Sequence, residues 1–532
     1  MKKILLKNGK IYSLDRDFNT YSTILIDSGS ISYLGNEELN INDEVNVIDL
    51  NGRSVIPGFY DSHVHVLEVG KAKRTLDIHE VENKFKLMKL LEKKVEQVPA
   101  GKWIFGNGWK KDMWENGAFP SKVDIDPVSQ ENPVALYSKD MHTLLLNSKA
   151  LDVLEIKKDT PFKGYGEIEL DSEEQPTGIL KEDACNLFTK KVTQIENLKQ
   201  TLFDAFASFF EKGITSIDTM ENSESCHDLF CMLERLNKEE ELPLRINVFF
   251  PYSMLDNLIE CGLTSGFGSE YLKIGGIKIF ADGALGSQTA HLLNSYENDP
   301  LNFGISTISQ EKLDEIVAIA SRNYLKCAVH AIGDAAVNKA INSFIKSSEL
   351  NLVKENNTQR FLNHRIEHMQ LIQPDDIERL TKSGATASMQ PIHISGDIDI
   401  AKKYWGERCR YSYLNKTLID KGIPLIMGSD APVEDMNPLM GIYAAVTRKC
   451  LNSRKNNSFY PEERLTLEEA LDCYTVTPHV LNGDAHIKGS IMVGKRADIV
   501  ILSDDLFNVP VEKIPEIRVE MTICNGNVVF ER

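Results

Sequence analysis

The sequence predicts an α/β fold in which a (β/α)8 TIM-type barrel is joined to a small β-sandwich domain built from both chain termini. Two observations lead to this fold class. Eight apolar runs of strand length alternate with amphipathic helical runs through the middle of the chain, and the two ends resemble each other as pairs of short β-prone runs. A barrel of this type takes about 250 residues, so the 532 residues leave room for a second domain and a large insertion.

The first candidate barrel strand is entered through Pro57-Gly58, and most of the eight strands are separated by a helical run such as 312–322 or 374–382. Strand–helix alternation predicts a parallel sheet, and eight repeats predict that the sheet closes into a barrel. The eight runs lie at residues 54–65, 213–218, 244–250, 272–281, 325–331, 361–368, 385–389 and 425–429.

Each end of the chain carries two β-prone runs around an Asn-Gly pair, Asn8-Gly9 at the start and Asn525-Gly526 at the finish. Asn-Gly between such runs is the strongest short-range signal for a β-hairpin. We expect residues 1–54 and 487–532 to form one composite β-sandwich domain, with the barrel over 55–486. Two unrelated terminal hairpins are the alternative.

Residues of about 67–200 do not follow the alternation. They carry helical runs at 81–97 and 197–210 and a polar stretch rich in glycine and aromatic residues. We expect a large insertion after the first barrel strand, on the face where barrel active sites lie.

Composition narrows the class of partner. The chain has 60 Lys and Arg against 78 Asp and Glu, a formal net charge of −18, which disfavours nucleic acid as a partner because phosphate binding needs a basic face.

No run approaches the ~18 apolar residues of a membrane span. The first residues are too polar for a signal peptide, and nine scattered cysteines without a C-x-x-C pair indicate reduced thiols. We expect a cytoplasmic protein with a small-molecule substrate and no nucleic-acid or membrane partner; a homodimer is compatible with the sequence.

Side chains that bind metals stand at the carboxyl ends of four candidate strands. His63 and His65 lie two apart, so both imidazoles project from one face of a strand. His330, His368 and Asp430 each close another apolar run. Taken singly, each has another explanation, such as a core histidine or a helix-capping aspartate. Together they are the ligand types of a catalytic Zn²⁺ site, which keeps one position open for water.

Over almost its whole length the sequence resembles the amidohydrolase superfamily, and within it the formamide deformylase-like, family 3 branch. The motifs that carry the resemblance are IPGFYDSHVH at 56–65, GIKIFADGALGS at 276–287, VHAIGD at 329–334, RIEH at 365–368, GSDAP at 428–432 and GKRADIV at 494–500.

The resemblance implies a metal set of His63, His65, Lys278, His330 and His368, with Asp430 as the catalytic carboxylate of the eighth strand. In related enzymes a lysine at the position of Lys278 is carboxylated on Nζ and bridges two metal ions. A plain lysine beside a single ion is the alternative. The expected cofactor is therefore one or two divalent metal ions per chain, with Zn²⁺ the expected element.

The resemblance also implies residues that face the substrate. His142 stands inside the insertion and is a candidate catalytic donor to the oxyanion; a histidine at a helix entry in a solvated loop is the alternative. Glu182 and Asp334 are candidate substrate-binding residues, although Asp334 also fits an N-cap of the helix that follows it. His393 is a further candidate because it follows the end of the seventh candidate strand. The branch commonly has Arg at the position of Gln288 and an aromatic residue at that of Leu145, so substrate identity does not transfer from relatives.

The predicted activity is hydrolysis of an amide-type carbon–nitrogen bond, in an N-formyl or N-acyl compound, through attack by metal-bound hydroxide with Asp430 as general base. Two alternatives stay open. One is deamination of a heterocycle, which the absence of a Glu two or three residues after His330 or His368 disfavours. The other is a barrel that binds a ligand without catalysis.

Overall fold

The computed structural model describes residues 3–37, 39, 45–78, 81, 83–109, 120–138, 143–162, 166–189, 191–192, 197–221, 225–350, 362–450 and 458–532. The chain divides into two compact units, and each is described by itself. One unit combines Met1–Val66 with Ala205–Arg532, and the other is Leu67–Asp204.

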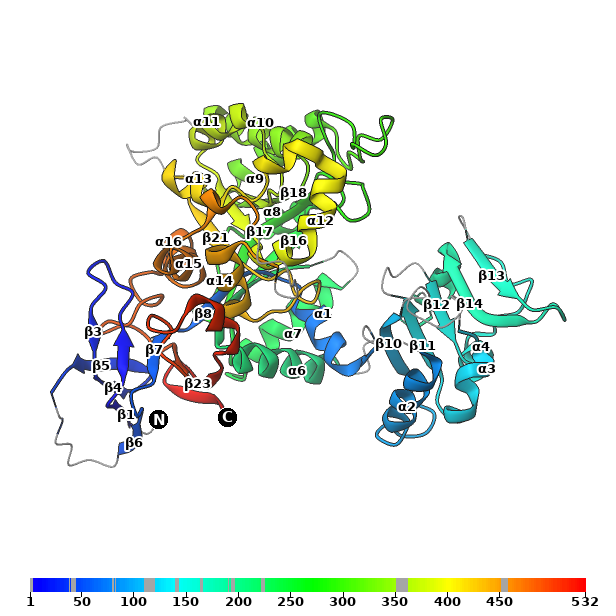
Figure 1. Cartoon of the computed structure of the whole chain (residues 1–532), viewed down its shortest axis with the longest axis horizontal. Helices are drawn as coiled ribbons and strands as arrows, with labels where there is room; N and C mark the ends of the chain where they lie inside the picture. Colours follow the sequence, from blue (N-terminus) through cyan, green and yellow to red (C-terminus); the bar gives the residue numbers. More distant parts are fainter. Residues whose placement is uncertain are drawn as a thin grey trace. The chain divides into compact units, whose positions relative to one another are not determined.

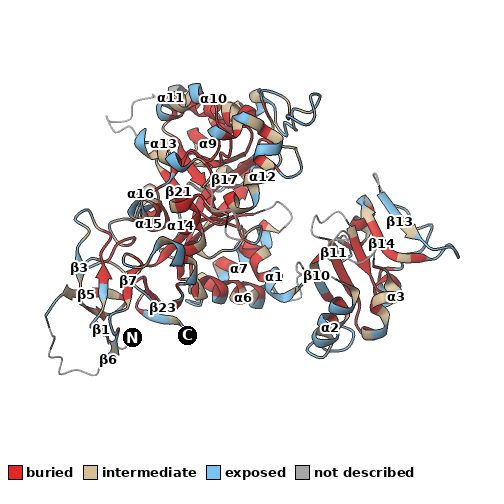
Figure 2. Ribbon diagram, in the orientation of Figure 1, coloured by how far each residue is buried: buried red, intermediate tan, exposed pale blue. Residues whose placement is uncertain are grey.

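An eight-stranded parallel barrel forms the centre of the first unit, as predicted. Each strand pairs with the next one along the chain, and a parallel bridge between Val64 and Ala431 brings the two edges together. Most of the strands are buried along their whole length (Figure 2), as expected for a parallel sheet covered on both faces. The strands are β8 (Phe59–Val64), β15 (Ile214–Met220), β16 (Arg245–Pro251), β17 (Leu272–Phe280), β18 (Cys327–Ala331), β19 (Arg365–His368), β20 (Thr386–Met389) and β21 (Leu425–Met427).

Helices follow the barrel strands, and their ends match local sequence signals. The helix Gln310–Arg322 begins after Ser309, whose side chain accepts a hydrogen bond from the Lys312 amide, and Pro374–Ser383 ends at Gly384 in the left-handed conformation. The helices of this part of the chain are α6 (Leu198–Glu211), α7 (Cys226–Lys238), α8 (Leu255–Glu260), α9 (Gln310–Arg322), α10 (Asp334–Leu350), α11 (Pro374–Ser383), α12 (Ile394–Trp405), α13 (Asn415–Asp420), α14 (Pro438–Thr447), α15 (Leu467–Tyr474) and α16 (Val476–Leu481).

Two further sheets of the first unit are built from the chain ends. A four-stranded sheet has the order β5-β4-β1-β6, and a six-stranded sheet has the order β24-β23-β22-β7-β2-β3, so that C-terminal strands (red in Figure 1) lie beside N-terminal ones (blue). Apolar side chains from both sheets form one core, as in a sandwich. The strands are β1 (Lys3–Lys7), β2 (Lys10–Tyr12), β3 (Thr20–Tyr21), β4 (Thr23–Asp27), β5 (Ser30–Gly35), β6 (Val45–Asp49), β7 (Ser54–Pro57), β22 (Ile499–Leu502), β23 (Val519–Cys524) and β24 (Asn527–Glu531). The predicted domain boundaries stay a prediction.

Only one of the two predicted Asn-Gly hairpins is present. Around Asn525-Gly526, β23 and β24 pair antiparallel, and both turn residues have positive φ, as a type I′ turn requires. The prediction at Asn8-Gly9 is wrong, because β1 pairs with β4 and β6 whereas β2 pairs with β3 and β7. Asn8 has a φ of +58°, but Gly9 is outside the left-handed region, so the chain passes from one sheet to the other.

The predicted first barrel strand, 54–65, is in fact two strands separated by Gly58. β7 belongs to the six-stranded terminal sheet and β8 to the barrel. The Gly58 amide donates to the Asp498 carbonyl at 2.8 Å, and the next amide, of Phe59, donates to Gly213 at 3.0 Å. A Cβ atom on Gly58 would lie 2.3 Å from Thr215 Oγ1, so the crossing between the sheets leaves no room for a side chain.

The second unit contains a six-stranded sheet of order β13-β14-β12-β11-β10-β9, which the sequence analysis missed. β9 has only two residues, and β10 carries Gly106 and Gly108, which weaken a strand signal. The strands are β9 (Leu76–Asp77), β10 (Ile104–Trp109), β11 (Val134–Ser138), β12 (Thr143–Leu146), β13 (Gly166–Leu170) and β14 (Pro176–Glu182). The helices from this part of the chain are α1 (Val66–Arg74), α2 (Lys84–Val95), α3 (Lys122–Ile125), α4 (Ser148–Leu154) and α5 (Asn186–Thr189). Among the described residues, none of the helices combines the length and apolar character that crossing a bilayer requires.

The crossing at Gly58 yields a prediction about stability. Gly58→Ala forces a methyl group against Thr215, and overpacking of this kind costs about 1–3 kcal/mol, measured as a lower free energy of unfolding in urea. Gly286→Ala is the matched control, because a Cβ atom there meets nothing within 4 Å. Equal stability of the two variants would contradict the steric account of the crossing.

Candidate metal centre

Four histidines gather at the carboxyl end of the barrel. His63 and His368 lie in β8 and β19, His330 lies in β18, and His65 follows β8 by one residue. Parallel strands bring these ends together at one edge. The ring centroids of His63 and His368 are 4.8 Å apart, those of His330 and His368 4.5 Å, and those of His63 and His65 5.8 Å. The predicted histidines are therefore neighbours in space.

Asp430 lies against this cluster with its two oxygens facing different partners. Oδ1 is 3.2 Å from His65 Nε2 and 3.5 Å from His63 Nε2, whereas Oδ2 is 3.8 Å from His393 Nε2. One ligand atom from each of His63, His65 and Asp430 lies within 4.8 Å of the others. Burial raises the pKa of Asp430, but the hydrogen bond from His65 and the nearby histidines hold it well below its usual range, so the carboxylate is ionised at neutral pH.

Three of the histidines use one ring nitrogen for a protein contact and leave the other available. His63 Nδ1 is 2.6 Å from Glu367 Oε2, His330 Nε2 is 3.0 Å from the Gly283 carbonyl, and His368 Nδ1 is 2.8 Å from Gln390 Oε1. His63 Nε2 is buried and has no hydrogen-bond partner among the described residues. Histidines that bind metals typically hold their second ring nitrogen in this way.

Burial determines the charge of these imidazoles. It lowers the pKa of His63 to about 4 and that of His330 to about 3, with the charge of Lys278 adding to both shifts. Burial also holds the pKa of His368 well below its usual range. These rings are neutral at pH 7 and can offer a lone pair, as a metal ligand must.

Lys278 extends from β17 with only 2% of its surface exposed, and its Nζ has no hydrogen-bond partner among the described residues. Nζ lies 5.0 Å from the ring centroid of Phe280. Burial lowers the pKa of Lys278 to about 8. A buried amine without an acceptor is unfavourable, so Lys278 and the open nitrogen of His63 together fit a site completed by a bound cation and its ligands.

The residues that support His63 inside the barrel were not predicted from the sequence. Arg365 donates to both oxygens of Glu367 at 2.7 and 3.1 Å, and it also pairs with Asp218. Arg365 and Glu367 lie two apart on β19, so both side chains point to the same face. Charged residues at alternate positions of a buried strand were the available signal.

A second missed carboxylate ties the first and last barrel strands together. Asp61 accepts hydrogen bonds from the Ser429 amide at 2.9 Å, from the Ser429 hydroxyl at 2.6 Å and from the His63 amide at 3.2 Å. Burial raises the pKa of Asp61 to about 7. The backbones that carry His63 and Asp430 are thereby held next to each other.

The remaining predicted site residues lie in different elements. His393 lies in a short 3-10 helix, Pro391–His393, beside Asp430. Asp334 is fully buried as the first residue of α10, where its carboxylate accepts from the Leu293 amide and the Gln373 side chain. Glu182 ends β14 in the second unit and is exposed. His142 lies outside the described residues.

The two departures from the family pattern also have places in the structure. Leu145 is completely buried in the apolar core of the second unit, so it packs in that core rather than lining an open substrate pocket. Gln288 lies between β17 and α9, where its Oε1 accepts from Asn298 Nδ2 at 2.9 Å.

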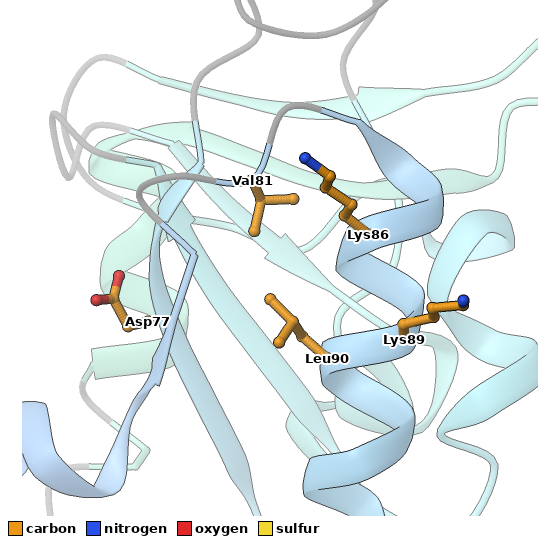
Figure 3. Close-up of a pocket in the computed structure, with 5 residues that line it drawn as sticks. All are labelled: Asp77, Val81, Lys86, Lys89 and Leu90. Atoms are coloured by element: carbon orange, nitrogen blue, oxygen red, sulfur yellow. The ribbon is translucent and has the colours of Figure 1, made fainter.

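A cavity of about 330 Å³ lies in the second unit, beside α2, and none of its lining residues belongs to the histidine cluster (Figure 3). Lys86, Lys89 and Leu90 line it from α2, opposite Asp77 and Val81. The cavity is therefore lined by residues of the second unit.

Comparison with known proteins agrees with this geometry. The crystal structure of an uncharacterized metal-dependent hydrolase from Pyrococcus horikoshii matches with a TM-score of 0.79 and 28% identity, over 96% of this chain and 99% of that one. The fold and this similarity place the protein among the metal-dependent hydrolases. A sequence model of the amidohydrolase family matches residues 46–530, and the chain belongs to that family.

Two relatives illustrate the range of sequences that resemble this chain. Protein LONG AFTER FAR-RED 3 of Arabidopsis thaliana is 32% identical over 515 residues, covering 94% of this chain and 87% of that protein. The N-substituted formamide deformylase of Arthrobacter pascens is 23% identical over 552 residues, covering 100% and 99% of the two chains.

The cluster predicts a measurable response to metal. Adding Zn²⁺ or Mn²⁺ to metal-stripped protein should raise its midpoint of thermal unfolding, because a ligand that binds only the folded state stabilises it, by about 2.7 kcal/mol at 100 times Kd. His63→Asn should remove most of this shift. His486→Asn, at an exposed histidine, should keep it. A shift of equal size in the wild type and His63→Asn would place the metal elsewhere.

Proposed function

We propose that this protein hydrolyses the amide-type carbon–nitrogen bond of a small N-formyl or N-acyl compound. The observation that carries the proposal is the set of buried, neutral imidazoles next to an ionised Asp430. The N-substituted formamide deformylase among its relatives supports the choice of bond.

The residues proposed to hold the metal are His63, His65, His330, His368 and Lys278, with Asp430 next to them. Imidazole and carboxylate ligands suit Zn²⁺. When bound, a divalent cation supplies Lewis acidity, which lowers the pKa of a water ligand towards about 7 and polarises a carbonyl group.

Asp430 is proposed to act as the general base. Its Oδ1 faces His63 and His65 while Oδ2 faces His393, so the carboxylate lies between two of the proposed ligands and His393. It would accept the proton that the attacking water loses and return it to the nitrogen of the departing amine. His393, Asp334 and Glu182 as substrate contacts, and His142 as a donor to the oxyanion, stay predictions.

Lys278 is proposed to carry a carboxyl group on Nζ. The neutral amine adds to carbon dioxide and loses a proton, which leaves an anionic carbamate. Burial favours the neutral amine by lowering the pKa of Lys278 to about 8, and its Nζ has no competing partner among the described residues. A carbamate offers two oxygens and would support two ions, whereas a plain lysine would accompany one.

The role of Asp430 can be separated from its contribution to metal binding. Asp430→Asn should still bind Zn²⁺ but lose about 10²–10⁴-fold in kcat, the usual contribution of general acid–base catalysis, measured on a panel of N-formyl, N-acyl and cyclic amides. Asp435→Asn, at an exposed aspartate in the same loop, is the control. Undiminished turnover by Asp430→Asn would remove this role, and turnover confined to heterocyclic amines would favour a deaminase.

A further inference from the structure

We propose that Arg365 and Glu367 act as a positioning pair that fixes the tautomer of His63, so that its Nε2 lone pair is always available to the metal. The inference rests on the proposed metal-dependent function. It concerns residues that touch neither substrate nor metal and act only through His63.

Arg365 is held rigidly inside the barrel by acceptors from several strands. Its guanidinium donates to the Ser62 carbonyl of β8 at 2.6 Å, to Ser388 Oγ of β20 at 3.0 Å and to Asp218 of β15. The ring of Phe249 covers one face, with its centroid 4.9 Å from the guanidinium carbon. A planar guanidinium with acceptors on several sides has one orientation, so the direction in which it meets Glu367 is fixed.

Glu367 is held by Arg365 and in turn fixes the position of the His63 ring. Oε1 accepts from Arg365 Nε at 2.7 Å, and Oε2 accepts from Arg365 Nη2 at 3.1 Å and lies 2.6 Å from His63 Nδ1. An ionised carboxylate can only accept hydrogen bonds, so His63 must carry its proton on Nδ1. The other nitrogen, Nε2, then has a lone pair directed towards Asp430, 3.5 Å away.

The bond from Arg365 to Ser62 adds a second constraint. Ser62 immediately precedes His63 in β8, so the same guanidinium positions both the main chain before His63 and the carboxylate that binds its ring. Arg365 thereby links the backbone and side-chain placement of one proposed ligand.

Glu367→Gln distinguishes tautomer control from simple packing, because it changes the hydrogen-bonding pattern while keeping the shape. An NH₂ group at either position opposes an Arg365 donor, but Nε is closer, at 2.7 Å, than Nη2, at 3.1 Å. The amide oxygen is therefore expected to take the position nearer to Nε. The NH₂ group then faces His63 Nδ1, which must accept. The proton moves to Nε2, and the lone pair for the metal is lost.

The experiment is a Zn²⁺ titration of metal-stripped, full-length protein against a chromophoric chelator, with thermal unfolding recorded in parallel. Glu367→Gln should bind Zn²⁺ about 10–100-fold more weakly than the wild type, the usual effect of losing a partner of a ligating histidine. The matched control is Asp498→Asn, which removes a buried carboxylate bound by Arg245 in the same unit. It should lose stability without a change in Zn²⁺ affinity.

Each outcome supports or overturns the proposal. Glu367→Gln within twofold of the wild-type affinity would overturn it, as would an equal loss of affinity in Asp498→Asn. If Glu367→Gln does not fold, Glu367→Asp provides the test, because it keeps the charge but withdraws the carboxylate from Nδ1; affinity reduced at least fivefold supports the proposal, and unchanged affinity overturns it. If the wild type itself binds no divalent metal, the proposed function fails rather than the role of Glu367.

Discussion

The site depends on the pairing of a buried guanidinium inside the barrel. Arg365 is only 4% exposed, and a charge in that environment is tolerated only with partners that compensate its lost hydration. Asp218 on one side and Glu367 on the other supply the compensation. Removing one member of such a buried pair costs about 3–5 kcal/mol, so fold and site are stabilised by the same contacts.

Burial and hydrogen bonding also give the imidazoles and Asp430 the different charge states that the proposed chemistry needs. The imidazoles of His63, His330 and His368 are neutral because hydration is lost around them, while Asp430 stays ionised because His65 donates to it. A low-dielectric site strengthens both effects. At neutral pH the site therefore holds neutral imidazole nitrogens with free lone pairs beside the ionised carboxylate of Asp430. This combination suits a divalent cation.

The sequence allowed the barrel and the cluster to be predicted because both follow local rules. Apolar runs of strand length mark buried parallel strands, and their carboxyl ends meet at one edge, so His63, His330, His368 and Asp430 were brought together by topology alone. The sheet of the second unit was missed because β9 has only two residues and β10 is interrupted by two glycines. The hairpin at Asn8-Gly9 was wrong because the partners of β1 and β2 come from residues further along the chain.

The contacts of Arg365 and Glu367 could not be predicted from the sequence, for a different reason. Glu367 binds a histidine 304 residues earlier in the chain, and Arg365 binds an aspartate 147 residues earlier. Contacts between residues so far apart in the sequence depend on how the barrel closes. They also depend on which inward-facing side chains lie at the same level along the barrel axis. A single sequence shows that Arg365 and Glu367 are unusual in an apolar strand, but not which residues they contact.

The central claim is that the histidine cluster beside Asp430 binds a divalent metal. The most direct test is anomalous diffraction at the zinc absorption edge from crystals of the Zn²⁺-loaded protein. One or two peaks within about 2.0–2.2 Å of the ring nitrogens of these histidines, with continuous density beyond Lys278 Nζ when two are present, are the expected result. An anomalous peak only at other residues, or none at this cluster in protein that is saturated with Zn²⁺, would contradict it.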